Sequence, residues 1–423
     1  MGSIYRIIHV SHPISTLTTL TTATQHHATQ SATPDHGRLD PPLYQHSFVG
    51  PLFRPQLQLL TSRSPSRYHA PPHLSVQRLQ PTRDEYFKDV VFAALRALFG
   101  SLTVSQSRYL LPLTTHTYNS LAKKKNFTPQ STDLPSGVQA HWLGDRNAQV
   151  TLVYFHGGGY VNPAAWSHLQ YLEGLVKLFT DQGHSFSCVV LAYSLAPEAE
   201  YPTQLAQAAE LLHHLLETEH RSPASLIIGG DSAGGNLTLS VLSHILHPHP
   251  DAPRVPKIPL SGPIGGALLL SPWVSFDCSH PSYKRNAESD TLPKQAITYW
   301  ASLFLGSSKR EGIVMGDTYS EPLVAESQWW SGAHNVVDEV IIWAGGGEVF
   351  EDGIKAFASK FIDGWTHGGG DRKKINLVVS PRLGHGEPIL DIELRCKKGP
   401  GAIAIEDWVK TRLCEKKSEH PNV

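Results

Sequence analysis

The stretch that most constrains the fold is the run from Leu226 to Leu237, Leu-Ile-Ile-Gly-Gly-Asp-Ser-Ala-Gly-Gly-Asn-Leu. It places an apolar, strand-like segment before a Gly-x-Ser-x-Gly turn and an apolar, helix-compatible segment after it. A serine on such a sharp turn stands clear of the sheet only if its neighbours carry no Cβ, which Gly230 and Gly234 provide. The pattern predicts a nucleophilic Ser232. The alternative is the glycine-rich turn that joins a strand to a helix in any α/β protein.

A second glycine-rich loop lies upstream of this turn. The apolar run Val150–Phe155 predicts a buried strand, and it leads into His-Gly-Gly-Gly-Tyr. A glycine run can turn bare backbone N–H groups toward one point, where negative charge builds on a carbonyl oxygen during acyl transfer. We expect the amides of Gly158, Gly159 and Ala233 to hold this oxyanion, with Gly157 shaping the turn. Alone, the loop would indicate only a flexible glycine segment, but its order before the serine motif favours a paired role.

These two motifs resemble those of a known family. The His-Gly-Gly-Gly-Tyr run that begins at His156 and the Gly-Asp-Ser-Ala-Gly-Gly-Asn run that begins at Gly230 are similar to signatures of the hormone-sensitive-lipase family of α/β-hydrolases, which includes many microbial esterases. Residues 192–198, Ala-Tyr-Ser-Leu-Ala-Pro-Glu, resemble a further family block. Ser194 stands there where the family usually has arginine. We interpret this difference as a change in structural pairing and not in chemistry.

The resemblance runs from about Val138 to the C-terminus, and residues 89–128 are similar to fungal members. It implies an α/β-hydrolase fold, in which a mostly parallel central sheet is flanked by helices on both faces. It also implies a helical cap from about residues 84–125 and 276–330. The alternation of strand-like and helix-like segments agrees with this fold class. The expected strands are residues 138–142, 150–155, 188–193, 225–229, 267–270, 340–344 and 375–379. The expected helices are residues 84–99, 167–179, 204–219, 353–362 and 403–413.

Aromatic side chains are dense in the second expected cap segment, where the strand–helix rhythm is interrupted. These residues are Tyr283, Tyr299, Trp300, Phe304, Trp329 and Trp330. Core packing of the cap is the favoured interpretation, and an acyl or aromatic substrate pocket is the alternative.

A catalytic triad also needs a carboxylate on a loop between the serine and the histidine. Glu348 follows the expected strand 340–344, where the resembling family has its acid, usually Asp. A carboxylate there orients the imidazole and stabilises it once it is protonated. Glu351 and Asp352 lie one helical turn away and remain alternatives. Their other role would be to begin the helix 353–362, because acidic residues suit the positive end of a helix dipole.

His385 lies on the loop after the last expected strand, residues 375–379. Among 24 histidines, it alone combines this position with the order serine, acid, histidine. We expect it to take the proton from Ser232 and return it to the leaving alcohol. The neighbouring Glu387 is expected to be solvated.

The overall charge and the cysteines exclude some functions. Lys+Arg 36 and Asp+Glu 37 leave a net charge of -1, so neither nucleic acid nor an anionic membrane is expected as the main partner. The four cysteines are widely spaced and match no metal or disulfide signature, which fits ordinary thiols in a reducing compartment. They are Cys188, Cys278, Cys396 and Cys414.

Residues 1–82 differ in composition from the rest of the chain. They are rich in Ser, Thr, Pro and His, which predicts a disordered or low-complexity extension before a hydrolase domain at 83–423. Their scarcity of acidic residues is shared with organelle transit peptides, so organelle targeting is the alternative to a cytoplasmic location. No apolar stretch is long enough for an integral membrane segment. Lys123 to Lys125 are expected to form a solvated turn.

These features predict a serine hydrolase that cleaves carboxylic esters of small or medium acyl chains through an acyl-enzyme, with the serine, glutamate and histidine named above as its triad. The expected partner is a small-molecule ester, and the chemistry needs no metal or organic cofactor. Three other polar residues of the motifs are expected to be structural. His156 would shape its loop, and Asp231 and Asn236 would secure the serine turn.

Two alternatives use the same scaffold. An acyltransferase or lactone hydrolase of a biosynthetic pathway would keep the triad and change the acceptor, which depends on cap shape and water access. A non-catalytic receptor, of which the gibberellin receptor is the known example, keeps the serine but lacks the histidine. The presence of His385 argues against a receptor. The sequence determines neither the substrate-binding residues nor the oligomeric state.

Overall fold

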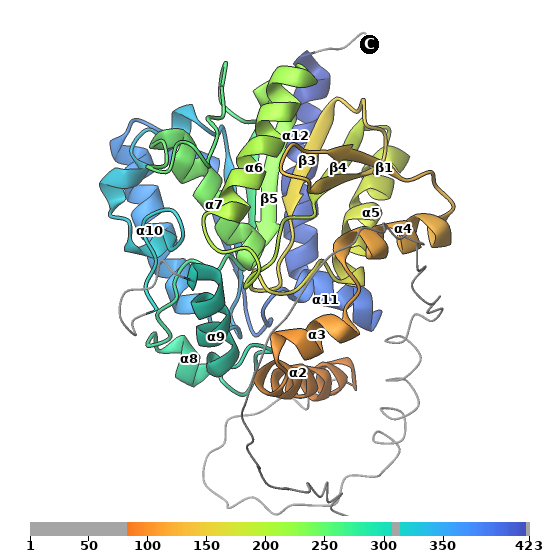
Figure 1. Ribbon diagram of the computed structural model, residues 1–423, viewed down its shortest axis with the longest axis vertical. Coiled ribbons are helices and arrows are strands. Elements are labelled where there is room, and N and C mark those ends of the chain that lie inside the picture. Colours follow the sequence, from red (N-terminus) through yellow and green to blue (C-terminus); the bar gives the residue numbers. More distant parts are fainter. Residues whose placement is uncertain (1–82, 307–313, 420–423) are drawn as a thin grey trace, which may run out of the picture. The chain divides into compact units, whose positions relative to one another are not determined.

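An eight-stranded sheet forms the centre of the part of the chain that this computed structural model describes, residues 83–306 and 314–419 (Figure 1). The predictions of disorder and targeting for residues 1–82 lie outside the described residues. The strands are β1 (Gln130–Asp133), β2 (Gln139–Leu143), β3 (Val150–Phe155), β4 (Phe186–Leu191), β5 (Leu226–Asp231), β6 (Gly266–Leu270), β7 (Val340–Gly345) and β8 (Ile375–Ser380). Their order is β1-β2-β4-β3-β5-β6-β7-β8. The pairs β1 with β2 and β2 with β4 are antiparallel, and the other pairs are parallel.

Helices cover both faces of the sheet, which confirms the predicted fold class. They are α2 (Arg83–Ser101), α3 (Val104–Leu110), α4 (Thr114–Lys125), α5 (Trp166–Asp181), α6 (Thr203–His213), α7 (Ala233–Leu246), α8 (Ser282–Arg285), α9 (Lys294–Leu305), α10 (Glu351–His367), α11 (Glu387–Leu394) and α12 (Pro400–Glu419). One apolar layer joins the sheet to α6, α7 and α10, and the other joins it to α5 and α12. In β3, Val153 and Phe155 pack in the first layer and Leu152 and Tyr154 in the second, as strand alternation requires. None of the helices in the described ranges has the length and apolarity needed to cross a membrane.

The parallel strands end in register at one edge of the sheet. The last residues of β5 and β6, Asp231 and Leu270, are register partners. The last residues of β7 and β8, Gly345 and Ser380, are partners as well. The loops that follow these strands therefore meet at one edge, where open α/β sheets collect their functional residues.

Helices α2 and α9 pack against each other near this edge, and Figure 1 shows them together with α3 and α8. The ring of Phe99 in α2 meets the ring of Trp300 in α9 edge to face, with centroids 5.6 Å apart. Phe304, also in α9, stacks at 3.9 Å on Tyr160 of the glycine-rich loop. Both expected cap segments therefore contribute side chains beside that loop.

The aromatic residues between β6 and β7 do not form one cluster. Trp300 and Phe304 are buried in α9, whereas Tyr299 on the same helix is 45% exposed. Trp330 is buried against α10, with its ring 5.6 Å from Phe357 and 5.1 Å from Phe361. The aromatic density of this segment therefore reflects packing in two places, one beside the glycine-rich loop and one on the body of the fold.

Some local structure differs from the sequence prediction. The prediction of a turn at Lys123–Lys125 is wrong, because these residues form the last turn of α4. Burial of Tyr118 and Leu121 holds that helix on the body, and it ends at Asn126, which has φ 57°. Strand β1 and helix α11 were not predicted, since both are short and β1 is polar.

Candidate active site

Ser232 lies at a strained turn between β5 and α7. Its φ of 53° and ψ of -116° form a combination that non-glycine residues rarely adopt. A Cβ on Gly230 would lie 2.3 Å from the carbonyl oxygen of Phe155, and a Cβ on Gly234 would lie 1.8 Å from the same atom. The turn can therefore pack against the end of β3 only with glycine at both positions.

Asp231 ties the serine turn to the glycine-rich loop. Its Oδ1 accepts hydrogen bonds from the Gly157 amide at 2.9 Å and from the Tyr154 hydroxyl at 2.8 Å. Its Oδ2 lies 3.1 Å from Nε2 of His168. Because Nδ1 of His168 accepts the amide of Ala165, Nε2 carries the proton that is donated to Asp231. These bonds confirm the prediction that Asp231 secures the turn.

Asn236 joins three segments around the first turn of α7. Its Nδ2 donates to the carbonyl oxygens of Trp273 at 2.7 Å and Ser320 at 2.8 Å. Its Oδ1 accepts the Tyr160 hydroxyl at 2.6 Å. The amide side chain is buried with both ends bonded, which confirms its predicted structural role.

Two further motif residues have structural contacts. His156 donates from Nδ1 to the Gly157 carbonyl at 2.7 Å and stacks on Tyr193 at 4.2 Å. Burial lowers the pKa of His156 to about 4, so the ring is neutral near pH 7 and shapes the loop as predicted. Ser194, which replaces the family's arginine, exchanges two hydrogen bonds of 2.8 Å with the side chain of Gln207. Ser194 is thus hydrogen bonded within the body of the fold, which agrees with the interpretation that this difference from the family changes a structural pairing.

In the glycine-rich loop and the serine turn, the backbone amides of Gly158, Gly159 and Ala233 have no acceptor among the described residues, and the Tyr160 amide has none either. The amide of Gly157 differs, because Asp231 accepts it. Gly158 and Gly159 have φ of 114° and 62°, and a Cβ on Gly159 would lie 2.5 Å from the Trp300 ring. Unbonded N–H groups in a buried loop are costly unless a ligand atom meets them.

The imidazole of His385 is hydrogen bonded to Glu348. Its Nδ1 lies 2.8 Å from Oε2 of Glu348, whose Oε1 accepts the Gly345 amide at 2.9 Å. Glu348 is 0% exposed and His385 is 8% exposed. Burial lowers the pKa of His385, but the hydrogen bond and charge of Glu348 outweigh burial and raise it above 6.5. A carboxylate on Nδ1 leaves Nε2 to exchange protons with a substrate.

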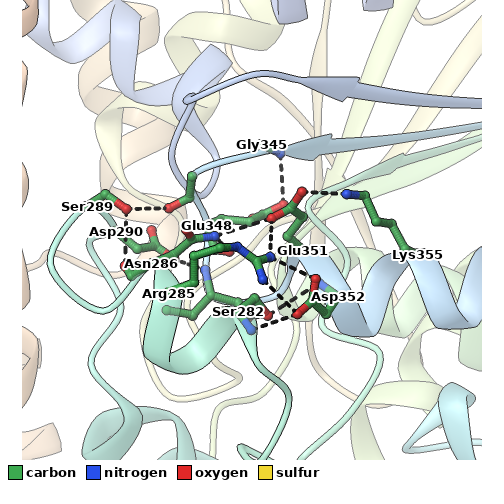
Figure 2. Close-up of polar contacts among 12 residues, drawn as sticks. Ser282, Arg285, Asn286, Ser289, Asp290, Gly345, Glu348, Glu351, Asp352 and Lys355 are labelled. Carbon is green, nitrogen blue, oxygen red and sulfur yellow. Dashed lines mark hydrogen bonds and ion pairs between the residues drawn. The ribbon is translucent and has the colours of Figure 1, made fainter. Parts of the chain in front are cut away.

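The two alternative acids are paired with basic side chains (Figure 2). Arg285 lies 2.6 Å from Glu351 and 2.8 Å from Asp352. Lys355 lies 2.5 Å from Glu351. Both acids occupy the first turn of α10, where the helix dipole favours negative charge. Of the three acids that the sequence left open, Glu348 is the one hydrogen bonded to the imidazole.

Ser232 and His385 are linked through packed aromatic rings. The Trp273 amide donates to the Ser232 carbonyl at 2.9 Å, the Trp273 ring lies parallel to Phe350 at 6.3 Å, and Phe350 lies 4.9 Å from the His385 ring. Against the effect of burial, the Asp231 carboxylate also helps to raise the pKa of His385. Within the described residues the serine hydroxyl and the imidazole form no hydrogen bond. Such contacts are often long until substrate binds.

The family model for the alpha/beta hydrolase fold matches residues 152–368. This range is slightly more than half of the chain, and it contains the glycine-rich loop, the serine turn and Glu348. The chain belongs to the hormone-sensitive-lipase-like family of α/β-hydrolases.

Named relatives of this α/β-hydrolase are distant. Neutral cholesterol ester hydrolase 1 of Pongo abelii is 26% identical over 163 residues, which cover 37% of this chain and 37% of the relative. Steryl acetyl hydrolase 1 of Saccharomyces cerevisiae is 23% identical over 256 residues, which cover 58% and 56%. The chain thus spans only part of each relative's length. The crystal structure of an esterase from the bacterial hormone-sensitive lipase family superposes with a TM-score of 0.57 at 20% identity, covering 77% of this chain and 98% of that one. This likeness shows the shared fold.

Asp290 joins the two loops of the α/β-hydrolase that carry Glu348 and His385, and sequence reasoning missed it. Its Oδ1 accepts the His385 amide at 3.1 Å, and its Oδ2 accepts the Val349 amide at 2.7 Å. The carboxyl group is fully buried, which raises its pKa. Asp290 lies between α8 and α9, outside any strand or periodic pattern, so no signal in the sequence pointed to it.

Glu387 is buried, so the expectation of a solvated side chain is wrong. It accepts the Gly384 amide at 2.6 Å and Nζ of Lys88 at 2.6 Å, and Lys88 also lies 2.6 Å from Asp391. A Cβ on Gly384 would lie 2.4 Å from the ring of Phe92. Helix α2 therefore packs directly on the histidine loop, with a lysine that only the tertiary fold brings there.

The described ranges hold no group of three or more His, Cys, Asp or Glu side chains that could bind a metal ion. Cys188, Cys278 and Cys414 are free thiols, and the first two are buried.

Proposed function

We propose that this α/β-hydrolase cleaves carboxylic esters through an acyl-enzyme. The Oγ of Ser232 attacks the ester carbonyl carbon while Nε2 of His385 takes the hydroxyl proton. The same imidazole then gives that proton to the leaving alcohol. Glu348 holds Nδ1 and stabilises the positive charge that the ring carries between these two transfers.

The backbone amides of Gly158, Gly159 and Ala233 would bind the oxyanion of the tetrahedral intermediate. Each such donor typically contributes about 2.7–4 kcal/mol to lowering the barrier. In the second half of the reaction a water molecule attacks the acyl carbon, His385 takes its proton, and the acid leaves as Ser232 is regenerated.

The observation that carries this proposal is the buried hydrogen bond between Glu348 and His385 at the sheet edge that also holds the serine turn. Burying a carboxylate beside a histidine costs free energy of desolvation. Such pairs, in which the carboxylate makes the imidazole more basic, are concentrated at functional sites. This pair also speaks against a non-catalytic receptor, which would need neither group. The acyltransferase and lactone hydrolase alternatives keep the same residues and differ in the acceptor.

Small or medium acyl chains are the proposed acyl groups. Two distant relatives are named for hydrolysis of cholesterol esters and of steryl acetyl groups. Those names support esters as the substrate class for this chain.

Ser232→Ala is expected to abolish labelling by a fluorophosphonate probe and to lower kcat on p-nitrophenyl esters by roughly 10⁶-fold, because the nucleophile is lost. The measurement is in-gel fluorescence of the labelled protein, followed by rates on p-nitrophenyl esters of increasing acyl length. The length at which kcat/KM falls would give the size of the acyl site.

Ser225→Ala is the matched control, because Ser225 directly precedes β5 at the end opposite Ser232, and within the described residues its hydroxyl bonds only to the Ser222 carbonyl. Its labelling and rates should equal those of the wild type. Labelling that survives in Ser232→Ala, or a wild type that is never labelled, would contradict the proposal. A competing alcohol in the assay separates hydrolysis from acyl transfer through the ratio of acid to new ester.

Asp290→Asn is expected to shift the pH profile toward lower pH. Against the effect of burial, the Asp290 charge helps to raise the pKa of His385, so removing it lowers that pKa. A general base acts only when unprotonated, so kcat/KM should reach its plateau at a lower pH than in the wild type. The plateau itself should fall by about 3- to 10-fold, because asparagine has one acceptor oxygen for two loop amides.

Asp352→Asn is the control for this pH measurement. Asp352 binds Arg285 and the Ser282 amide and has no contact with the imidazole. Its acid limb should coincide with that of the wild type. An unshifted limb in Asp290→Asn would show that Asp290 only holds the loops and has no electrostatic effect on His385.

A further inference from the structure

Five consecutive apolar residues run from the last two positions of α3 to the start of α4, and four of them are exposed. This segment, Tyr-Leu-Leu-Pro-Leu at 109–113, is called the apolar loop below. Tyr109 is 89% exposed, Leu113 66% and Leu110 51%. Single exposed apolar side chains are ordinary on protein surfaces, but a contiguous exposed run indicates a contact surface.

The sequence around the apolar loop is basic. From residue 90 to residue 132 the chain has no Asp or Glu, and its charged residues there are Arg96, Arg108, Lys123, Lys124 and Lys125. Helix α4 begins directly after the loop and ends with the three lysines. By helical spacing, Leu113, the exposed His116 and the exposed Lys123 lie along one face of α4. Arg96, Arg108 and Lys125 are paired with acids from other segments, whereas Lys123 and Lys124 form no ion pair among the described residues. The net charge of -1 therefore conceals the unpaired positive charge that these two lysines place at the end of α4.

The apolar loop is fastened at both ends to the loop that carries the candidate oxyanion amides. Before it, Arg108 donates from Nε to the Val161 carbonyl at 2.8 Å. After it, Oγ1 of Thr114 accepts the Ala164 amide at 3.0 Å. The exposed residues are thus held beside the proposed active site.

We propose that the apolar loop docks this α/β-hydrolase on an anionic lipid–water interface, from which a lipid-borne ester reaches Ser232. The leucines enter the acyl boundary, the Tyr109 ring lies at the level of the headgroups, and Lys123 and Lys124 approach the phosphates. The delivery of an ester rests on the proposed function, whereas the docking does not.

The charge pattern separates a lipid surface from a second copy of the chain. Two apolar loops facing each other would bring their two basic segments together, and like charges across an interface are unfavourable. An anionic bilayer offers both an apolar interior and negative charge at its surface. The apolar side chains of the segment therefore match the bilayer interior, and its lysines match the negative surface.

The first test is sedimentation of the full chain with phosphatidylcholine vesicles, with and without phosphatidylserine. The wild type should bind the vesicles that contain phosphatidylserine, and salt should weaken this binding. The double variant Tyr109→Ser/Leu113→Ser should bind at least about tenfold more weakly, because two apolar side chains no longer leave water. The matched control Val324→Ser/Ile403→Ser removes two other exposed aliphatic side chains and should bind as the wild type does.

Three results would overturn the docking. One is a wild type that binds neither kind of vesicle, and another is an equal loss of binding in the loop and control variants. The third is a dimer in light scattering that the loop variant dissociates while vesicle binding is unchanged, which would assign the loop to a second copy. Sedimentation is repeated with Ser232→Ala, which should bind as the wild type does, so the result stands whether or not the protein is an esterase.

The second test compares two substrates. The loop variant should hydrolyse p-nitrophenyl acetate in solution at the wild-type rate, because Tyr109 and Leu113 make no contact with the proposed triad. On a long-chain p-nitrophenyl ester held in phosphatidylserine-containing vesicles, it should be about tenfold slower than the wild type. Equal rates of variant and wild type on the vesicle substrate would overturn delivery from the interface.

Discussion

Alanine in place of His385 is expected to lower kcat on p-nitrophenyl acetate by roughly 10⁶-fold, because removing the general base disables the triad as a unit. KM should change little, since the imidazole acts mainly on the transition state. A residual rate above the uncatalysed reaction should remain, because the oxyanion amides are unaltered. The measurement is the steady-state rate of p-nitrophenol release at saturating ester.

His367→Ala is the control for this loss. His367 is exposed at the end of α10, and in the part of the chain that the structure describes its ring bonds only to the Asp363 carbonyl. Its kcat should match that of the wild type. If His385→Ala kept more than about one hundredth of wild-type activity with its fold intact by circular dichroism, another base would be doing the proton transfer, and the proposed triad would be wrong.

Glu348→Gln is expected to lower kcat by about 10³- to 10⁴-fold. Glutamine removes the negative charge that stabilises the imidazolium, although its carbonyl oxygen can still accept the Gly345 amide. Glu348→Asp should retain more activity than Glu348→Gln, because it keeps the charge on a side chain one methylene shorter. The measurement is kcat for both variants, with thermal unfolding to show that each is folded.

Glu351→Gln provides the matched comparison, since it makes the same chemical change three residues along the chain. Glu351 is held by Arg285 and Lys355 and not by the imidazole, so the loss of kcat should stay below about tenfold. A larger loss of kcat in Glu351→Gln than in Glu348→Gln would show that Glu351, in the first turn of α10, is the catalytic acid.

Much of the site could be predicted from local patterns. The serine turn follows from Gly230 and Gly234, because only glycine allows the approach to Phe155. The glycine-rich loop is likewise predicted from its run of glycines after an apolar strand. His385 is predicted as the catalytic base from its position on the loop after the last strand. Each of these positions depends on the few residues around it, so the reasoning needed no long-range contact.

Other residues could not be assigned in this way. The sequence favoured Glu348 as the acid but left Glu351 and Asp352 open, because all three lie within about one helical turn. Their contacts separate them, since Glu348 bonds to the imidazole whereas the other two bond to basic side chains. Glu387 is charged and lies on a loop, which predicts solvation. It is nevertheless buried, because α2 places Lys88 on it from the other end of the described chain.

By itself, the sequence determined the fold class, seven of the eight strands of the sheet and the two glycine turns, because apolar periodicity and missing Cβ atoms act over a few neighbouring residues. Only the tertiary structure decided which acid meets His385, that Asp290 ties the two loops together, and that the apolar loop stays exposed beside the oxyanion amides. These outcomes depend on contacts between residues tens to hundreds of positions apart. Burial and hydrogen-bond partners at such separations are set by how the elements pack, and no local pattern encodes them.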